Sequence, residues 1–289
     1  MPDGIVVIDK PQGWTSMDVC AKLRGALREK RVGHAGTLDP MATGVLPVFV
    51  GQATKAVRFA EDGRKEYRAA LRLGVVTDTQ DTTGTVLRTA RADDVTEAAL
   101  RAALARFTGE QTQIPPMYSA VKRGGKKLYE LARAGVEVER APRPVTIFAL
   151  ELLERIAPEE WRLRVVCSKG TYIRTLCHDV GAALGCGGAM SALTRTAAAG
   201  FSLSDAVPLE EALARGAEAL RGVDSLFSRY PAYRLGDAET ERRCRCGNPI
   251  RDGAAGDGIY RVYGCDGTFL ALSRCEGGVL TSIRNFFSA

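Results

Sequence analysis

Two stretches of alternating apolar and polar side chains constrain most strongly what this chain can fold into. In residues 65–73 and 161–168, apolar side chains recur at every second position. This period predicts β-strands with one buried face, because successive side chains of a strand point to opposite sides. The short apolar runs at residues 4–9 and 45–50 also predict strands. We therefore expect a sheet in the core of this protein.

Amphipathic helices are predicted between these strands. The first is expected to have Ser16 as its N-cap and to end near residues 31–33. Another is expected over residues 94–107, where Asp94 and Glu97 have the spacing of a capping box. Helical periodicity also marks residues 171–184 and 209–220. Strands and helices together predict a mixed α+β domain.

Residues 111–144 are predicted to form a mobile basic arm inserted in this domain. The stretch contains several Pro and Gly, with one or two helical turns expected at residues 128–134. Residues 122–143 carry seven Lys or Arg against three Glu. A second basic cluster consists of Arg242, Arg243, Arg245 and Arg251. Such clusters can bind a phosphate backbone, and two solvated surfaces are the alternative.

The character of the chain changes after about residue 225. Gly-rich turns separate short strands that are predicted at residues 259–263, 268–274 and 279–284. These strands are expected to form a small antiparallel β module. The predicted domains are therefore residues 1–225 and 226–289.

The composition narrows the class of protein. The 289 residues carry a formal net charge of +6, which is compatible with nucleic-acid binding and with many basic enzymes. No apolar run is long enough to predict a membrane span, and the first residues lack the pattern of a secretory signal peptide. We therefore expect a cytoplasmic protein.

The eight cysteines fall into two groups. The members of one group stand among apolar or Gly neighbours, as buried free thiols do: Cys20, Cys167, Cys177 and Cys186. The members of the other could hold zinc: Cys244, Cys246, Cys265 and Cys275. Their spacing lacks the paired C-x2-C knuckles of zinc ribbons. Free thiols are therefore favoured, and no metal site is predicted.

One carboxylate stands in a glycine-rich loop at residues 33–44. Asp39 is followed by Pro40, and Asp-Pro commonly begins a helix, so Asp39 could be only an N-cap. His34 in the same loop could be only a hydrogen-bonded turn residue. The glycines also suit a loop that holds a reactive acid close to another chain. Both interpretations of Asp39 are open from this loop alone.

Residues 168–175 lead from a predicted strand into a helix and place Tyr172 and Arg174 in the first turn. An Arg at this point can pair with a carboxylate from another loop and keep it ionised, as a nucleophile must be. An ordinary surface Arg is the alternative. The chain contains no Gly-x-Ser-x-Gly, Walker or His-Glu-x-x-His motif, so serine hydrolases, P-loop enzymes and zinc peptidases have no motif to support them.

Taken together, the glycine-rich loop, residues 65–67 and residues 168–175 closely resemble the TruB family of tRNA pseudouridine synthases. The resemblance covers about residues 4–205 in family order, and the last 60 residues are similar to the RNA-binding PUA module of many members. Further matching segments are residues 9–13, 77–84, 115–122 and 193–195. The resemblance implies a mixed, mainly antiparallel sheet with flanking helices and an arm that closes over RNA.

The resemblance also implies a reaction. Uridine 55 in the T loop of tRNA would become pseudouridine, with no cofactor, after the base is flipped out of its stack. Asp39 would be the nucleophile, attacking C1′ of the ribose or C6 of the uracil. Tyr67 would stack on the uracil and could take a proton, and Arg174 would pair with Asp39. Further residues implied to contact the substrate or the RNA are His34, Lys10, Pro11, Tyr172, Leu193, Lys122, Lys126 and Lys127.

The implied partner is the T stem-loop of tRNA, and a monomer without an obligate protein partner is expected. A guide-RNA-dependent rRNA pseudouridine synthase is one alternative, although such enzymes have longer terminal extensions. A non-catalytic RNA-binding or tRNA-folding protein is another, although Asp39, Tyr67 and Arg174 occurring together disfavour it.

Overall fold

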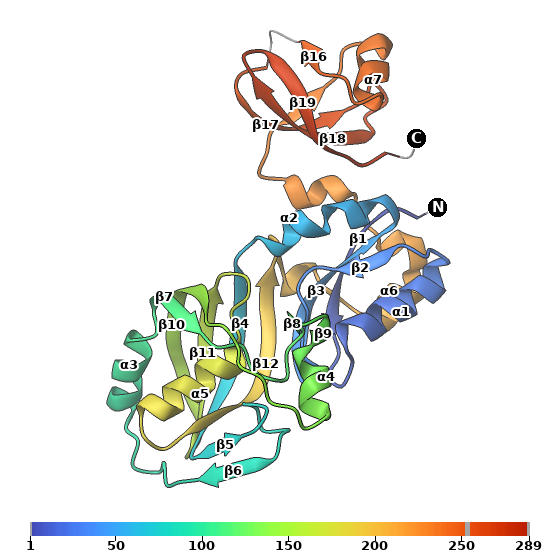
Figure 1. Ribbon diagram of the computed structural model, residues 1–289. Helices are drawn as coiled ribbons and strands as arrows, with labels where there is room; N and C mark the ends of the chain where they lie inside the picture. The colour runs from blue at the N-terminus through green and yellow to red at the C-terminus, as the bar shows by residue number, and fades with distance from the viewer. Residues whose placement is uncertain (1, 252–254, 288–289) are drawn as a thin grey trace. The chain divides into compact units, whose positions relative to one another are not determined.

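The computed structural model describes residues 2–251 and 255–287 and divides into two compact units (Figure 1). The first, here called the terminal unit, contains Met1–Asp39, Leu46–Glu61 and Ala199–Ala289. The second, the central unit, contains Pro40–Val45 and Asp62–Ala198. These units differ from the two predicted domains, whose boundary near residue 225 stays a prediction.

The central unit is built on a sheet of long, mainly antiparallel strands. Its hydrogen-bonded order is β12 (Gly188–Ala198), β4 (Lys65–Leu73), β11 (Glu160–Cys167), β10 (Arg143–Ala157) and β7 (Gly109–Gln113). The start of β3 (Thr43–Val50) pairs in parallel with β12. The alternation predicted for β4 and β11 is confirmed, because Tyr67, Leu71, Trp161 and Leu163 are all buried.

Helices and a hairpin flank this sheet. Helix α5 (Ile173–Ala183) packs on β12 and β4, and α3 (Glu97–Ala105) packs on β10 and α5. The predicted cap Asp94 is wrong, since Thr96 caps α3 and its hydroxyl accepts the Ala99 N–H at 3.2 Å. Beside them, β5 (Val75–Thr77) and β6 (Val86–Thr89) form a two-stranded ribbon.

The terminal unit begins with β1 (Gly4–Lys10), α1 (Ser16–Leu27) and β2 (Val32–His34). The predicted cap Ser16 is wrong: Thr15 is the N-cap and forms a capping box with Asp18. The helix ends before the predicted point because Arg28 adopts a left-handed backbone conformation, with φ 51°. The 3-10 helix Gly51–Ala56 and helix α2 (Val57–Glu61) follow β3.

The terminal unit continues after β12 with short elements. They are β13 (Phe201–Ser202), the 3-10 turn Leu203–Asp205, β14 (Val207–Pro208), α6 (Leu209–Arg215), and the 3-10 helices Gly216–Ala219 and Val223–Phe227. Strand β14 pairs in parallel with β1. The helix predicted for residues 209–220 is interrupted at Gly216, because the backbone of this residue has a positive φ of 56°.

The C-terminal residues form a separate five-stranded sheet. Its order is β15 (Ala232–Arg234), β17 (Gly258–Tyr263), β18 (Phe269–Glu276), β19 (Val279–Asn285) and β16 (Ile250–Arg251), with helix α7 (Ala238–Arg245) beside it. Most pairs are antiparallel, as predicted, but β15 and β17 are parallel. The sheet has its own apolar core, which includes Val262, Leu270 and Cys275. A curled sheet of this size is consistent with a PUA-like module.

Within residues 2–251 and 255–287, no helix has the length and apolar character that crossing a membrane requires.

Candidate active site and RNA-binding arm

The loop that carries Asp39 is held by hydrogen bonds on its terminal-unit side. The Ser16 hydroxyl accepts the Leu38 N–H at 2.9 Å and donates to the Leu38 carbonyl at 3.3 Å. The Ala35 N–H donates to the carbonyl of Pro47 at 3.1 Å. Both Ser16 and Leu38 are buried, whereas Asp39 is partly exposed. The carboxylate thus follows directly on a residue whose backbone is fixed at both polar atoms.

No helix begins at Pro40. Residues 40 and 41 form a turn, and strand β3 begins at Thr43. The alternative that Asp39 serves only as a helix cap is therefore wrong. Too few residues separate Asp39 from β3 for a helix to form between them.

Lys10 and His34, both expected to contact the substrate or RNA, lie at strand ends in the terminal unit. Lys10 has no exposed surface, and its ammonium donates to the carbonyls of Trp14 at 2.6 Å and of Pro11 at 2.9 Å. It therefore stabilises the turn after β1. His34 ends β2 and is paired with Val48 on β3, half-buried. Their contacts with RNA stay predictions.

Arg174 lies in the first turn of α5 and is 5% exposed, which excludes the surface-Arg alternative. Its guanidinium donates to the carbonyls of Thr79 at 3.0 Å and of Tyr118 at 2.8 Å. Asp81 lies 3.7 Å from it and is equally buried. Arg174 therefore joins the start of α5, the loop after β5 and the base of the arm. Its pairing with Asp39 stays a prediction.

The backbone of Tyr172 is held by a single amide side chain. Gln113 at the end of β7 accepts the Tyr172 N–H at 2.9 Å and donates to the Tyr172 carbonyl at 3.2 Å. Gln113 is 4% exposed, so solvent does not compete for these bonds. This clamp fixes where α5 begins, and with it the position of Arg174.

Tyr67 and Leu193 lie on neighbouring strands of the central sheet, and both are 7% exposed. Leu193 on β12 faces Ala69, the second residue after Tyr67 on β4. The next residue of β12 on the same face is Arg195, which stands opposite Tyr67 and has no exposed surface. Its side chain hydrogen-bonds to that of Tyr67. The structure therefore brings Tyr67, Leu193 and a buried arginine together.

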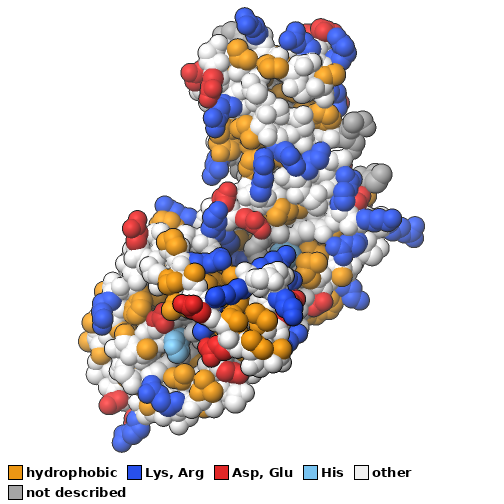
Figure 2. All heavy atoms as spheres, in the orientation of Figure 1, with side chains coloured by type: hydrophobic (Ala, Val, Ile, Leu, Met, Phe, Trp, Pro, Cys, Tyr) orange, Lys and Arg blue, Asp and Glu red, His pale blue; other side chains and the backbone are white. Residues whose placement is uncertain are grey.

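The arm carries a basic hairpin, β8 (Lys122–Arg123) and β9 (Lys126–Lys127), followed by α4 (Leu128–Arg133). The turn between the strands is Gly124-Gly125, both with positive φ, as a tight two-residue hairpin requires. Lys122 and Lys126 are exposed, and Figure 2 shows Lys and Arg side chains gathered on the face that carries the hairpin. The helical turn predicted for residues 128–134 is confirmed.

Aromatic and basic side chains are interleaved at the root of this hairpin. The Lys127 ammonium lies 5.3 Å from the centre of the Tyr129 ring, and the Arg133 guanidinium lies 5.5 Å from it. Contacts of this kind fix the direction of both charges. The arm thus presents ordered cations, which suits binding to phosphates.

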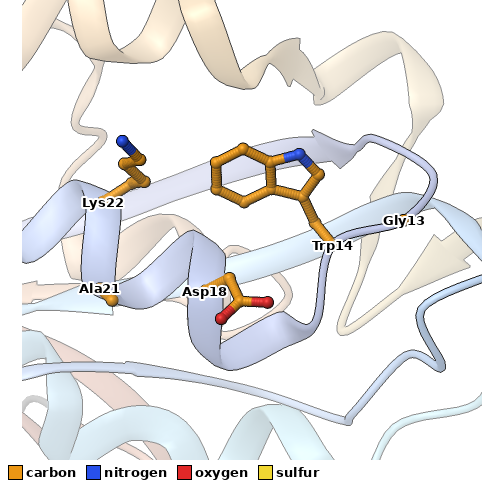
Figure 3. Close-up of a pocket in the computed structure, with 5 residues that line it drawn as sticks. All are labelled: Gly13, Trp14, Asp18, Ala21 and Lys22. Atoms are coloured by element: carbon orange, nitrogen blue, oxygen red, sulfur yellow. The ribbon is translucent and has the colours of Figure 1, made fainter.

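A shallow depression of about 480 Å³ lies in the terminal unit. It is lined by Gly13, Trp14, Asp18, Ala21 and Lys22, and Figure 3 shows the Trp14 indole and Lys22 above α1. None of the predicted site residues lines it.

Burial separates the cysteines into two kinds. Burial raises the pKa of the Cys20 and Cys167 thiols to about 11 and that of Cys177 to about 12. These thiols are the buried free cysteines that the sequence predicts. Cys244 and Cys275 are also buried, whereas Cys246 and Cys265 are exposed. Over the described residues, no group of His, Cys, Asp and Glu is arranged to hold a metal ion.

Sequence reasoning missed the roles of Asp81 and Arg195, although both lie in segments that match the family. Asp81 accepts hydrogen bonds from Thr79 at 2.9 Å and from the Thr83 N–H at 3.0 Å. The signal for Arg195 was an arginine at an inward position of a strand. Their other partners, Arg174 for Asp81 and Tyr67 for Arg195, could not be predicted because they lie far away in the sequence.

The fold is that of a pseudouridine synthase. A crystal structure of a Cbf5–Nop10–Gar1 complex matches with a TM-score of 0.73 and 25% identity, covering 98% of this chain and 85% of that chain. A crystal structure of the archaeal box H/ACA sRNP Nop10–Cbf5 complex has a TM-score of 0.68 at 23% identity, with 98% and 86% covered, and shows the same fold.

The sequence comparisons narrow the class to one family. Residues 24–173 match the TruB family pseudouridylate synthase N-terminal domain, and residues 174–223 match the tRNA pseudouridylate synthase B C-terminal domain. The tRNA pseudouridine synthase B of Aromatoleum aromaticum is 45% identical over 99% of this chain and 93% of its own length. That of Alkaliphilus oremlandii is 51% identical over 82% and 77%. The chain belongs to the TruB family of pseudouridine synthases.

Proposed function

We propose that this protein converts the uridine conventionally numbered 55, in the T loop of tRNA, to pseudouridine. The observation that carries the proposal is the 45% identity to a tRNA pseudouridine synthase B over nearly the whole of both chains. The three residues to which the family motifs assign chemistry are all present, as Asp39, Tyr67 and Arg174.

The proposed reaction is an isomerisation in which nothing is oxidised or reduced. Asp39 attacks C1′ of the ribose or C6 of the uracil, the N-glycosidic bond breaks, the uracil turns, and C5 joins C1′. The bond that Asp39 formed is broken in turn, which restores its carboxylate. The proton from C5 leaves and N1 gains one, so the atoms balance. A flipped base in a loop is cheaper to expose than a paired one. Tyr67 is proposed to stack on the flipped uracil, because every base offers a π face, and its hydroxyl oxygen is proposed to take a proton in the reaction.

Arg174 is proposed to pair with Asp39 and keep it ionised. A neighbouring cation favours the charged form of a carboxylate, and a nucleophile must be charged. The contacts of Arg174 with Asp81 and with the Thr79 and Tyr118 carbonyls support this role, since they hold the guanidinium in place. Tyr118 lies within the arm, so RNA bound by the arm would contact a segment that is hydrogen-bonded to Arg174.

The basic hairpin is proposed to close over the T stem-loop, with Lys122, Lys126 and Lys127 on its phosphates. His34, Lys10, Pro11, Tyr172 and Leu193 are proposed to line or support the pocket for the flipped base. The C-terminal module would bind phosphates further along the tRNA. We also propose that the enzyme acts as a monomer in the cytoplasm, where its substrate occurs.

The test is tritium release from a T-arm minihelix labelled at C5 of the target uridine, with no guide RNA present. The protein should release tritium, and Asp39→Asn should release none while binding the minihelix as tightly. Asp94→Asn, which changes an exposed carboxylate before α3, is the matched control and should keep full activity. Measurable turnover by Asp39→Asn would overturn the assignment of the nucleophile.

The same assay separates the two alternatives. Release without a guide eliminates a guide-dependent rRNA synthase, and release of any kind eliminates a purely RNA-binding protein. No release from the minihelix, with release restored by a guide RNA, would contradict the proposal.

A further inference from the structure

A buried arginine stands opposite Tyr67, and neither the family motifs nor the relatives' names give it a role. Arg195 on β12 and Tyr67 on β4 are direct partners in the antiparallel register. Arg195 has no exposed surface, although an ionised side chain is costly to remove from water. A fold keeps such a charge at a considerable cost, which makes its contacts informative.

The contacts of Arg195 tie Tyr67 to strand β3. The Arg195 Nε donates to the carbonyl of Val45 at 2.7 Å. The same guanidinium hydrogen-bonds to Tyr67. Since a guanidinium has donors and no acceptor, the Tyr67 oxygen must accept this bond. The phenol oxygen is thereby fixed by a group that is itself anchored to backbone.

The backbone at Arg195 is constrained from two sides. A β-bulge follows Arg195, between the register pairs Arg195–Tyr67 and Ala197–Glu66. Bulges redirect side chains and occur often beside active sites. On the other side, Gly44 of β3 comes so close that a Cβ there would lie 2.2 Å from the Arg195 carbonyl oxygen. Neither strand can shift without breaking the pair.

We propose that Arg195 is a positioning residue that orients the hydroxyl of Tyr67 for the reaction; the proposal rests on the role of Tyr67 proposed above. Because Arg195 donates to the phenol oxygen, the proton of the hydroxyl must point elsewhere. The positive charge also favours negative charge on that oxygen. Burial lowers the pKa of the Arg195 guanidinium, and Tyr67 opposes this lowering, as expected of groups that stabilise each other.

Single-turnover kinetics test this role. Arg195→Met keeps most of the side-chain volume and should slow the reaction about 10²-fold, the scale of a misplaced group, with unchanged affinity for the minihelix. Arg195→Lys should recover part of the rate because it restores a donor and a charge. Arg68→Met is the control, since Arg68 adjoins Tyr67 on β4 but is exposed on the other face.

A double-mutant cycle separates positioning from a general structural role. In a Tyr67→Phe background, Arg195→Met should cause little further loss, because the hydroxyl it positions is gone. An equal loss in both backgrounds would overturn the proposal.

If Tyr67→Phe has no measurable turnover, a spectroscopic measurement tests the contact between Arg195 and Tyr67 instead. In protein labelled with tyrosine at ¹³Cζ, the resonance that Tyr67→Phe removes should move in Arg195→Met and stay in place in Arg68→Met. An unmoved resonance would overturn the proposal. If the resonance moves but wild-type protein releases no tritium, the proposed function fails while the contact stands, so the two failures are distinguishable.

Discussion

At the scale of single residues, Gly44 has little freedom to change. Its φ of 97° lies where side chains are rarely tolerated, and a Cβ would lie 2.2 Å from the Arg195 carbonyl oxygen. The same close approach lets β3 pair with β12 directly after the Asp39 loop, through Thr43–Thr194 and Gly44–Arg195. Glycine at this position therefore serves the geometry of the sheet rather than flexibility.

Gly44→Ala should lower the free energy of unfolding by about 1–3 kcal/mol from backbone strain, with the steric overlap adding to this loss. Urea denaturation would measure it. Gly25→Ala is the control, because Gly25 lies in α1 without a positive φ, and a Cβ there would meet nothing within 4 Å. That change should be neutral or stabilising. Equal midpoints for both variants would contradict the account.

Glu66 gives a pH-dependent prediction. Arg164 at 2.6 Å and the Thr196 hydroxyl at 3.0 Å hydrogen-bond to its carboxylate, and the bond from Arg164 is the main cause that lowers its pKa. Because the pKa of Glu66 is lower in the folded protein than in the unfolded chain, the ionised carboxylate stabilises the folded protein. This stabilisation is complete at pH values above the unfolded-state pKa of about 4.3, and it is lost as the pH falls through the folded-state pKa. Glu66→Gln should therefore destabilise the protein at pH 7 and have a smaller effect on stability at pH 2.

Urea midpoints of wild type and Glu66→Gln at the two pH values provide the measurement. The exposed Glu110 on β7 supplies the control Glu110→Gln, which should leave both midpoints unchanged. A loss of stability by Glu66→Gln that is as large at pH 2 as at pH 7 would exclude the ion pair as its cause.

At the scale of elements, the longer helices and the strands with clear alternation could be predicted, whereas β7, β12 and the starts of α1 and α3 could not. The predicted β4 matches the observed strand, because alternation over nine residues leaves no other register. Ser16 and Asp94 were wrong as caps because Ser, Thr and Asp serve almost equally well. Thr15 and Thr96 are the caps, since the backbone turns into a helix directly after them.

The basic hairpin is the element whose function is tested most directly. Lys126→Glu with Lys127→Glu should weaken binding of the minihelix and reduce the slope of log affinity against log salt by about 2, if both contact phosphates. Binding titrations at several salt concentrations would measure the slope. Arg91→Glu with Arg101→Glu changes the net charge equally at exposed positions and should leave the slope nearly unchanged. An unaltered slope for the lysine variant would contradict the proposal that the hairpin binds RNA phosphates.

At the scale of the whole molecule, Phe227 connects the C-terminal sheet to the rest of the terminal unit. Its ring meets Phe59 of α2 edge-on, with centroids 5.5 Å apart, and lies 5.6 Å from Phe286 and 6.2 Å from Phe269. Phe227 is 2% exposed. The predicted domain boundary near residue 225 thus falls in a segment that packs against both of its neighbours.

Phe227→Ala should destabilise the protein by about 3–5 kcal/mol, because it removes a buried ring at the centre of four. Thermal unfolding would show a lower midpoint or a separate early transition of the C-terminal module. Phe148→Ala, at a position that is 41% exposed, is the control and should have a much smaller effect. An unchanged melting curve for Phe227→Ala would mean that the rings contribute no stability.

The sequence by itself determined the family of this protein, the strands and helices with a clear periodicity, and the residues on which its chemistry is expected to depend. Those features are local, since alternation, turn residues and short motifs can be read within a few positions. Only the tertiary structure decided that Arg195 meets Tyr67 and that Asp81 meets Arg174. These partners lie far apart along the chain, and strand register and packing bring them together, which no local pattern encodes.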